Sequence, residues 1–424
     1  MKHNIEEVTL KNGAKGLFVD VPTATVMNFR IEFRAGNKFV KSVAIYETAH
    51  LMEHLAFGQN AKYKDEQEYE DEFTKNGAYH NAWTSDYSIC YEAECADFEW
   101  DRILDLQALA VAEPRFNEEE LKSEKGNVRA ELTGYQNDYS RLIWPKLQQE
   151  MGENVLTYAE RAKTISEITI KDIREHHRRT HRAGNMRFII TGNLKGRKRQ
   201  IIKKLENWPL KPGNRFDVGL DDFHAVDPVL IRRRDATNLT FGFTWTLKRK
   251  LEVSELMAMN CLNHILNGTM SSKILGKARR RGIIYGMGSG TGNGAWTSDW
   301  TFDGEVNEEN ASELFDLIAI ELSKIINGDL DDPTIRAAKS YALGRYQMGA
   351  QTVDQISNYY SSFFLEGTVE PFDDMPGRIE QIDKAAIVSL ARQFMQSGLS
   401  GLCAVGNLEK AFVTELWLRV TSSI

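Results

Sequence analysis

The N-terminal residues alternate between apolar and polar side chains in the way that β-strands do. Residues 8–10 and 16–21 carry this alternation on either side of Asn12 and Gly13, a dipeptide that favours the tight turn of a β-hairpin. Residues 26–33 form a longer apolar stretch and predict a third strand. The chain is therefore expected to begin with three strands.

Helical patterns follow these strands. Residues 44–57 predict one helix, and longer helices are expected over residues 98–111 and from Asn117 onward. Residues 82–94, which are rich in Trp, Tyr and Ile, are expected to contain a further strand, and residues 187–191 predict a buried strand. Strands, then helices, then strands again are typical of an α+β fold with a mixed β-sheet backed by helices.

The sequence contains an internal repeat. Residues 82–87, Ala-Trp-Thr-Ser-Asp-Tyr, recur at residues 295–300 as Ala-Trp-Thr-Ser-Asp-Trp. Weaker matches flank this one, between residues 134–136 and 345–347 and between the Gly-Asn-Leu sequences that begin at Gly192 and Gly406. Collinear matches at a nearly constant spacing indicate an ancestral duplication. We therefore predict two homologous α+β domains.

The boundary between the copies is expected where residues 209–213 bring together two prolines and a glycine, which interrupt both helical and strand patterns. We predict an N-terminal domain over residues 1–209 and a C-terminal domain over residues 225–424. The polar and acidic residues 210–224 between them suit a surface linker.

Composition narrows the classes of function. Hydrophobic residues make up 42% of the chain and charged residues 27%, and the formal net charge is −7, which disfavours nucleic acid or an anionic membrane as a partner. No apolar segment has the length of a membrane span or the form of a secretion signal, so the expected location is cytoplasmic. Four scattered cysteines lack Cys-x-x-Cys spacing, and any metal site is expected to use His and carboxylate ligands.

One short motif carries candidate chemistry. Residues 50–54 read His-Leu-Met-Glu-His and fall within the first predicted helix. Positions four apart share a helix face, so His50 and His54 can bind one metal ion while Glu53 reaches a water molecule beside it. This is the inverted form of the zinc-peptidase helix. The alternative is two histidines on a solvated helical turn, and a third ligand from elsewhere in the chain distinguishes the two.

The motif and its surroundings resemble the M16 (pitrilysin-like) peptidases of the two-domain bacterial and mitochondrial-processing type. That family takes its third zinc ligand from a glutamate at a characteristic distance beyond the second histidine, and Glu131 stands at that distance. The resemblance implies one Zn²⁺ per chain, bound by His50, His54 and Glu131, with Glu53 as the general base. Glu124, two helical turns before Glu131, matches an acid that supports the ligands in the family.

Residues 77–84 resemble the Gly-x-x-x-Asn-Ala-x-Thr strand of the same family. In the family this strand is a sheet edge that receives the substrate as an added strand. The resemblance gives Asn81, Ala82 and Trp83 a substrate-binding role here. His80 is interpreted as a residue that lines the strand rather than as a metal ligand.

The second copy does not repeat the motif. In the alignment of the copies, the positions of the helix motif and of Glu131 are occupied by Asn260, Asn263, His264 and Ala342. Such a set offers too few ligands for zinc. We therefore predict that the C-terminal domain has no metal site and that His264 is a structural residue.

The family's second domain supplies an arginine and a tyrosine that meet the substrate. Tyr285 matches the tyrosine. The arginine normally stands seven residues earlier, at the position of Ala278, whereas Arg279 is one residue closer. Tyr285 and Arg279 are therefore the candidate pair, with the arginine displaced in sequence.

Family members of this length pair with a second copy or with an inactive homologue to enclose a chamber. The resemblance implies a homodimer or heterodimer that cleaves peptides and small unfolded polypeptides, because a closed chamber excludes folded proteins. The alternatives are a catalytic subunit that needs its partner, a non-proteolytic subunit of the same fold, and a zinc hydrolase of small molecules. The alternating glycines of residues 286–294 do not fit a nucleotide-binding loop.

Overall fold

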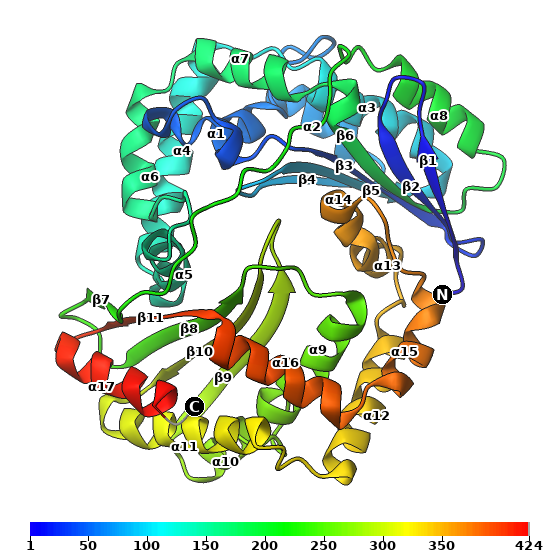
Figure 1. Cartoon of the computed structure of the whole chain (residues 1–424). Helices are drawn as coiled ribbons and strands as arrows, with labels where there is room; N and C mark the ends of the chain where they lie inside the picture. The colour runs from blue at the N-terminus through cyan, green and yellow to red at the C-terminus, as the bar shows by residue number, and fades with distance from the viewer. Residues whose placement is uncertain (423–424) are drawn as a thin grey trace. The chain divides into compact units, whose positions relative to one another are not determined.

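The computed structural model describes residues 1–422, which form two compact units (Figure 1). Unit 1 comprises Met1–Gly134, Ala159–Val218 and Met348–Phe372. Unit 2 comprises Tyr135–Tyr158, Gly219–Gln347 and the residues from Asp373 onward. Each unit contains one mixed sheet with helices packed on it, so the predicted fold class of two α+β domains is confirmed.

Unit 1 is built on a six-stranded sheet with the strand order β1-β2-β6-β3-β5-β4. Strands β2 and β6 are parallel, and all other neighbours in this sheet are antiparallel. The pairing of β1 with β2 confirms the predicted hairpin. The strands are β1 (Asn4–Thr9), β2 (Lys15–Asp20), β3 (Val26–Phe33), β4 (Tyr79–Thr84), β5 (Ile89–Ala96) and β6 (Met186–Gly192).

Several helices of unit 1 pack on its sheet, and one of them, α13, does so through an ion pair. Helix α3 packs against β5, and α1 against β4. Helix α13 instead meets a charged side chain of β3, since Arg30 forms ion pairs of 2.8 Å with both Glu92 of β5 and Asp354 of α13. The helices are α1 (Thr48–Leu55), α2 (Glu66–Thr74), α3 (Trp100–Ala112), α4 (Glu118–Gln136), α6 (Tyr158–Thr164), α7 (Ile170–Thr180), α8 (Lys198–Asn207), α13 (Val353–Tyr359) and α14 (Phe363–Glu366).

Unit 2 has a five-stranded sheet with the order β7-β11-β8-β10-β9. Its strands are β7 (Val229–Arg232), β8 (Leu239–Leu247), β9 (Ile284–Asn293), β10 (Ser298–Val306) and β11 (Leu399–Gly406). Its helices are α5 (Tyr139–Glu150), α9 (Val253–Asn267), α10 (Leu275–Arg280), α11 (Glu308–Ile326), α12 (Asp332–Met348), α15 (Met375–Gln381), α16 (Lys384–Ser397) and α17 (Lys410–Thr421).

The two sheets share one topology. Without β1, the first sheet reads β2-β6-β3-β5-β4, and each strand corresponds in order to β7-β11-β8-β10-β9. In both sheets the one parallel pair among the described strands stands at the same place, β2 with β6 and β7 with β11. The duplication predicted from the sequence is therefore visible in the order and direction of the strands.

The most similar sequences of the repeat do not occupy equivalent positions. Residues 82–84 end β4 and residues 85–87 lie in the turn to β5. Residues 295–297 lie instead in the turn before β10, which begins with residues 298–300. The strand expected within residues 82–94 is present as β5, but the range also includes the end of β4 and this turn. Trp, Thr and Tyr favour strands. Because these residues also occur in the turn between β4 and β5, the sequence pattern did not predict that turn.

The compact units exchange one segment each. Tyr135–Tyr158 belongs to the first half of the sequence but packs in unit 2, where α5 contacts β8 and β11. Met348–Phe372 belongs to the second half but packs in unit 1, where α13 contacts β3 and β6. The starts of the two segments are separated by the spacing of the repeat. The predicted linker at residues 210–224 separates the two copies of the sequence repeat, not the two compact units. It remains a prediction.

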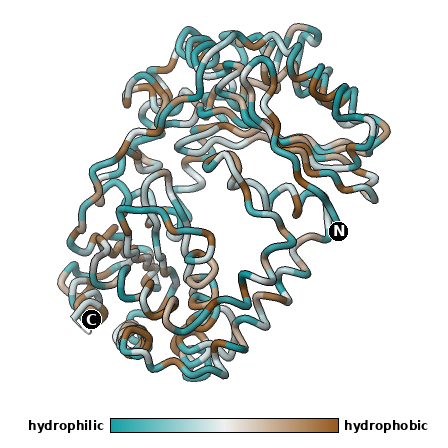
Figure 2. The backbone as a smooth tube through the Cα atoms, turned by 45° about the vertical axis from the view of Figure 1, so that its right-hand side comes forward, coloured by the Kyte–Doolittle hydropathy of each residue, from teal (hydrophilic) through white to brown (hydrophobic). Residues whose placement is uncertain are grey.

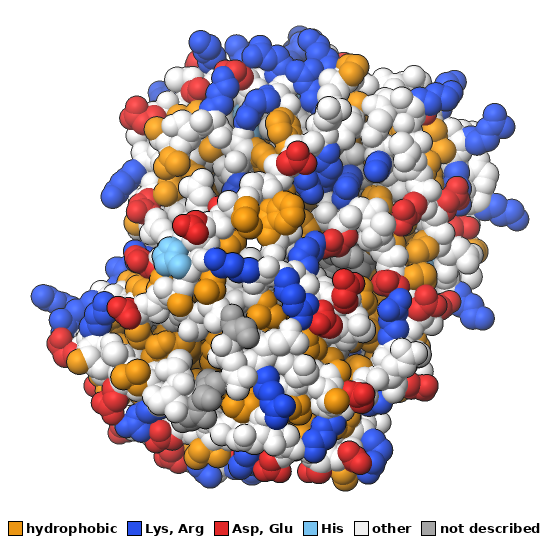
Figure 3. Space-filling model, viewed as in Figure 1, with side chains coloured by type: hydrophobic (Ala, Val, Ile, Leu, Met, Phe, Trp, Pro, Cys, Tyr) orange, Lys and Arg blue, Asp and Glu red, His pale blue; other side chains and the backbone are white. Residues whose placement is uncertain are grey.

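Other predicted elements differ mainly at their ends. The helix predicted over residues 44–57 is shorter, because Val43–Ile45 form a separate 3₁₀ turn before α1 begins at Thr48. Along the helices, hydrophilic and hydrophobic stretches alternate (Figure 2), as expected where one side of a helix faces a core. Figure 3 shows acidic and basic side chains interspersed over one face of the molecule. Among the described residues, no helix is both long and apolar enough to span a bilayer.

The packing of α5 on β8 generates a stability prediction. A Cβ atom at Gly242 of β8 would lie 2.6 Å from Cγ2 of Ile143 on α5, and a β-branched side chain has little freedom to move. We expect Gly242→Ala to destabilise unit 2 by about 1–3 kcal/mol through overpacking, measured by urea unfolding. Gly286→Ala on β9, where a Cβ meets nothing within 4 Å, is the matched control and should change stability by less than about 0.5 kcal/mol. Equal effects of the two substitutions would contradict this account.

Candidate metal centre

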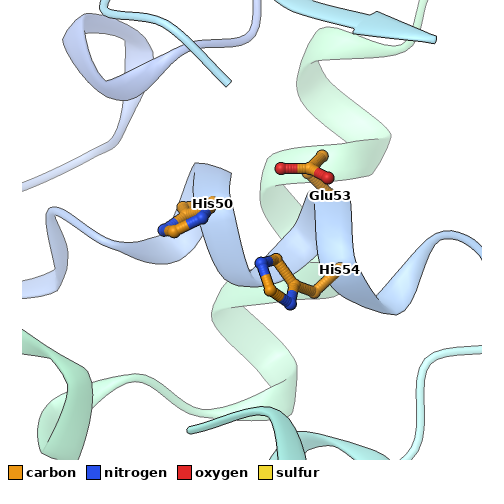
Figure 4. Close-up of side chains that lie close together, drawn as sticks. All are labelled: His50, Glu53 and His54. Carbon is orange, nitrogen blue, oxygen red and sulfur yellow. The ribbon is translucent and has the colours of Figure 1, made fainter. Parts of the chain in front are cut away.

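Helix α1 presents three polar side chains together. His50, Glu53 and His54 all project from this helix (Figure 4), and one ligand atom from each lies within 4.8 Å of the others. Among the described residues this is the one group of three or more His, Cys, Asp or Glu side chains with that spacing. His50 is buried, while Glu53 and His54 are half-buried. The helix therefore brings together the residues that its sequence spacing predicted.

A carboxylate from a second helix completes the cluster. Oε2 of Glu131, on α4, lies 3.4 Å from Nε2 of His50 and 3.7 Å from Nε2 of His54. Ligand atoms that each lie about 2.0–2.1 Å from one tetrahedral zinc ion are about 3.3–3.4 Å from one another. The separations in this chain fit such an arrangement after shifts of a few tenths of an ångström. His50, His54 and Glu131 are thus chemically and geometrically suited to hold zinc.

Each imidazole is oriented by a carboxylate on its other nitrogen. Nδ1 of His50 lies 2.9 Å from Oε2 of Glu47, and Nδ1 of His54 lies 2.8 Å from Oε2 of Glu124. A carboxylate only accepts hydrogen bonds, so Nδ1 carries the proton of each neutral ring and Nε2 keeps its lone pair. Metal-binding histidines in proteins are commonly held in this way. Glu124 was predicted for such a role, whereas Glu47 was not.

The electrostatics of the metal-free cluster favour protonated histidines. Burial disfavours the charge on His50, but hydrogen bonds to Glu131 and Glu47 outweigh it and raise its pKa to about 8. Burial likewise opposes the charge on His54, yet Glu124 and Glu131 raise its pKa to about 10. A metal ion that binds Nε2 therefore displaces protons from the site, which makes metal binding pH-dependent.

Glu53 is the carboxyl of the cluster that comes from α1 itself. Burial raises its pKa, although the charges of His54 and His50 oppose that effect. Oγ1 of Thr84, at the end of β4, donates a hydrogen bond of 3.3 Å to Oε2 of Glu53. A half-buried carboxyl with a raised pKa is suited to accept and return a proton near neutral pH. The contact also fixes this carboxyl against the edge strand.

Strand β4 forms an edge of the first sheet. Tyr79, Asn81 and Trp83 are exposed on it, whereas His80, Ala82 and Thr84 are partly covered. The backbone of Ala82 lies in this edge, and the side chains of Asn81 and Trp83 lie on one face of it. The ring of His80 packs at a tilt against those of Phe57 and Phe73, and Nε2 of His80 lies 2.5 Å from Oε2 of Glu70. It does not belong to the cluster of α1.

Asn117 caps the start of helix α4, and Glu120 makes its contact outside this helix. The side chain of Asn117 accepts from the backbone N–H of Glu120 at 2.9 Å. The carboxylate of Glu120 instead accepts from the backbone N–H of Gln59, which follows α1, at 3.2 Å. Glu120 therefore ties the start of the glutamate-bearing helix to the end of the histidine-bearing helix.

In unit 2 the corresponding place is filled by an amide network. Asn263 of α9 accepts from Nε1 of Trp300 at 2.9 Å and donates to Oγ1 of Thr291 at 3.1 Å. The Asn263–Thr291 contact is the counterpart of Glu53–Thr84 in unit 1. His264 stacks on Tyr341 with ring centroids 3.7 Å apart. These contacts explain how the second copy keeps the framework of the site without its ligands.

Tyr285 and Arg279 contact each other in unit 2. Tyr285 is 85% exposed, and the Arg279 guanidinium carbon lies 4.5 Å from the centre of its ring. Nη1 of Arg279 also donates to the backbone oxygen of Tyr285 at 2.8 Å. Ala278 is fully buried in the core, so residue 279 rather than residue 278 presents the guanidinium beside the tyrosine.

The interactions of Glu47 were missed from the sequence. Glu47 stands three residues before His50, a spacing that places two side chains on one helix face, and this was the available signal. Arg161 forms hydrogen bonds with both carboxylate oxygens of Glu47, at 2.5 and 3.1 Å. No local pattern connects residues 161 and 47, because α6 and α1 meet only in the folded unit.

Comparison with known proteins identifies the class to which this arrangement belongs. Residues 41–160 match the family model described as insulinase, peptidase family M16, and residues 167–341 match the model of the peptidase M16 inactive domain. The motif on α1 lies in the first match, and the second match includes most of α9 to α12. The chain belongs to the M16 peptidase family.

Two relatives are similar over most of their length. The chain is 23% identical over 409 residues to an uncharacterized zinc protease of Rickettsia felis, covering 94% of this chain and 96% of that protein. It is 21% identical to an uncharacterized zinc protease of Bacillus subtilis, covering 92% and 95%. A shorter match of 131 residues, 25% identical, covers 30% of this chain and 27% of the human mitochondrial-processing peptidase subunit beta.

Solved structures show the same fold. A protease from Helicobacter pylori superimposes with a TM-score of 0.83 at 16% identity, covering 95% of this chain and all of that one. A peptidase M16 inactive domain protein from Pseudomonas fluorescens gives the same TM-score and identity, covering 96% and 98%. At these identities the similarity concerns the fold alone.

The raised histidine pKa values generate a prediction for the metal-free chain. The pKa of His54, about 10, lies above its ordinary value of 6.5. The charged form therefore stabilises the fold fully below about pH 6.5, and this contribution is lost as the pH rises through about 10. We expect the melting temperature of chelator-treated wild type, relative to His54→Gln, to fall between pH 7 and pH 10. The exposed His224→Gln serves as the control, and a difference that stays constant with pH would contradict the prediction.

Proposed function

We propose that this chain is a zinc-dependent endopeptidase that cleaves peptides and small unfolded polypeptides. The observation that carries the proposal is the convergence of three side chains from two helices, with Nε2 of both His50 and His54 facing one oxygen of Glu131 at 3.4 and 3.7 Å. The relatives named as zinc proteases support the choice of metal. His50, His54 and Glu131 are the proposed ligands, with Glu124 as a support of His54.

A zinc ion in such a site supplies Lewis acidity that polarises water and a carbonyl oxygen. Glu53 is the proposed general base, because its half-buried carboxyl has a raised pKa and is held by Thr84. It takes a proton from the attacking water at its carboxylate and returns that proton to the leaving amine.

Strand β4 is the proposed substrate-binding edge. An extended peptide that pairs with an edge strand satisfies its own backbone hydrogen bonds and runs alongside Thr84, which contacts Glu53. Asn81, Ala82 and Trp83 are the proposed contacts on this strand. Because most of the recognition is by backbone, the sequence preference is expected to be broad. Tyr285 and Arg279 are further proposed substrate contacts, which the exposure of Tyr285 and the contact of Arg279 with its ring support.

We further propose that the chain acts as a homodimer or with a homologous partner, enclosing the substrate. The match to a subunit of the mitochondrial-processing peptidase supports a multi-subunit arrangement. A subunit that is active only with a partner is the first alternative. A non-proteolytic subunit of the same fold is the second. The retention of the base and all proposed ligands favours an active enzyme.

The central test separates metal binding from proton transfer. We expect Glu53→Gln to retain zinc while kcat on a quenched-fluorescent peptide library falls by about 10²–10⁴-fold, the usual contribution of a general base. Glu131→Gln should lose bound zinc, measured by atomic absorption. Glu119→Gln, an exposed acid in the first turn of α4, should change neither quantity.

The outcomes discriminate between the candidates. Wild type that binds no zinc would overturn the proposal. Wild type that binds zinc but cleaves nothing alone points to a partner-dependent or non-proteolytic subunit, and light scattering then shows whether the chain pairs with itself.

The edge-strand role generates a separate prediction. We expect Asn81→Ala to lower kcat/KM by roughly ten-fold, because the lost hydrogen bond to the substrate contributes about 1–1.5 kcal/mol. Zinc content should remain that of wild type. Glu7→Ala, on the opposite edge strand β1, is the control. An Asn81→Ala enzyme with unchanged kcat/KM would remove this residue from the substrate site.

A further inference from the structure

Glu47 is the most enclosed acid of the metal centre. Its side chain is fully buried at the start of α1. One oxygen accepts from Nδ1 of His50 at 2.9 Å, and both oxygens accept from the guanidinium of Arg161 on α6, at 2.5 and 3.1 Å. Its backbone N–H donates to Oγ1 of Thr164, also on α6, at 3.3 Å. Helix α6 therefore fixes both the backbone and the side chain of this acid.

The two candidate ligand histidines are held in different ways. Glu124, which orients His54, is half-buried, and its second oxygen accepts from the neutral amide of Asn127 at 2.9 Å. Glu47 is fully buried, and its charge is balanced by a guanidinium. A buried carboxylate without such a partner is strongly unfavourable. Arg161 thus allows a charged carboxylate to be buried beside Nδ1 of His50.

We propose that Arg161 is a positioning residue for the metal centre, which acts through Glu47 to hold the ring of His50 in its metal-binding orientation. The proposal rests on the proposed zinc-binding function and extends it to a residue well beyond Glu131, the last proposed ligand along the chain. Arg161 contacts the carboxylate of Glu47, which in turn contacts His50.

The geometry of the guanidinium is essential to this role. Arg161 engages both oxygens of Glu47 through Nε and Nη2, and this two-point contact fixes the plane of the carboxylate as well as its position. The oxygen shared with His50 is then fixed relative to Nδ1. A lysine offers a single ammonium in place of the planar fork, so it can balance the charge but not set the plane.

The test measures zinc affinity by competition with a chromophoric chelator. We expect Glu47→Gln and Arg161→Met each to weaken zinc binding by about 10–100-fold, the effect usual for partners that orient a ligand. Because Arg161 acts through Glu47, the double variant should bind zinc no more weakly than the weaker single variant. Arg161→Lys should recover part of the affinity. In ¹⁵N-histidine NMR spectra, the Nδ1 proton of His50 should exchange with solvent faster in Glu47→Gln than in wild type.

The control is Lys163→Met, which removes a cation from the same helix without touching Glu47, and it should bind zinc as wild type does. Single-variant losses that multiply in the double variant would show that Arg161 acts independently, and a zinc affinity of Arg161→Met equal to wild type would also overturn the proposal. If Arg161→Met does not fold, the zinc affinity of Glu47→Gln is compared with that of the double variant Glu47→Gln, Arg161→Met. Unequal zinc affinities of these two variants would overturn the proposal. Failure of the proposed function is distinct, since then wild type itself binds no zinc.

Discussion

The candidate metal centre depends on placing the Nε2 atoms of two imidazoles 3.4 and 3.7 Å from one carboxylate oxygen that comes from a separate helix. His50 and His54 share a face of α1, so the helix alone sets their separation. Glu131 comes from the later helix α4, and its position relative to the histidines depends on how α1 and α4 meet. Glu120 binds the backbone just after α1, and Glu124 binds His54. Two acids of α4 thus fix the helices on either side of the site before any ion is bound.

The same requirement explains the acidity around the histidines. Without a metal, three carboxylates stand close to two imidazoles, and protons on the rings balance their charge. A divalent ion held by both Nε2 atoms and Glu131 would replace the Nε2 protons, while the Nδ1 protons bonded to Glu47 and Glu124 would remain. The same cluster therefore suits both a protonated, metal-free state and a metal-bound state. Burial raises the pKa of Glu53, although the charges of His54 and His50 oppose that effect.

The sequence was sufficient for the local parts of the site and insufficient for the long-range ones. The helix motif pointed to His50, Glu53 and His54 directly, because the spacing of residues on one helix is fixed. Glu131 and Glu124 came from a family spacing, not from physical pattern. Arg161 and Thr84 were not predicted in their roles, since each reaches the site only through tertiary packing. The similar residues at 82–87 and 295–300 indicated a true duplication although they occupy different structural positions, which shows that strand topology is preserved where sequence register is not.

The reciprocal exchange of Tyr135–Tyr158 and Met348–Phe372 has a consequence for synthesis on the ribosome. Unit 1 needs α13 to complete its ion pair with Arg30, and α13 is translated long after β6 has completed the first sheet. Until then the emerging chain carries Arg30 without one of its two acidic partners. The first unit can therefore complete its contacts with α13 only after most of the second unit has been made.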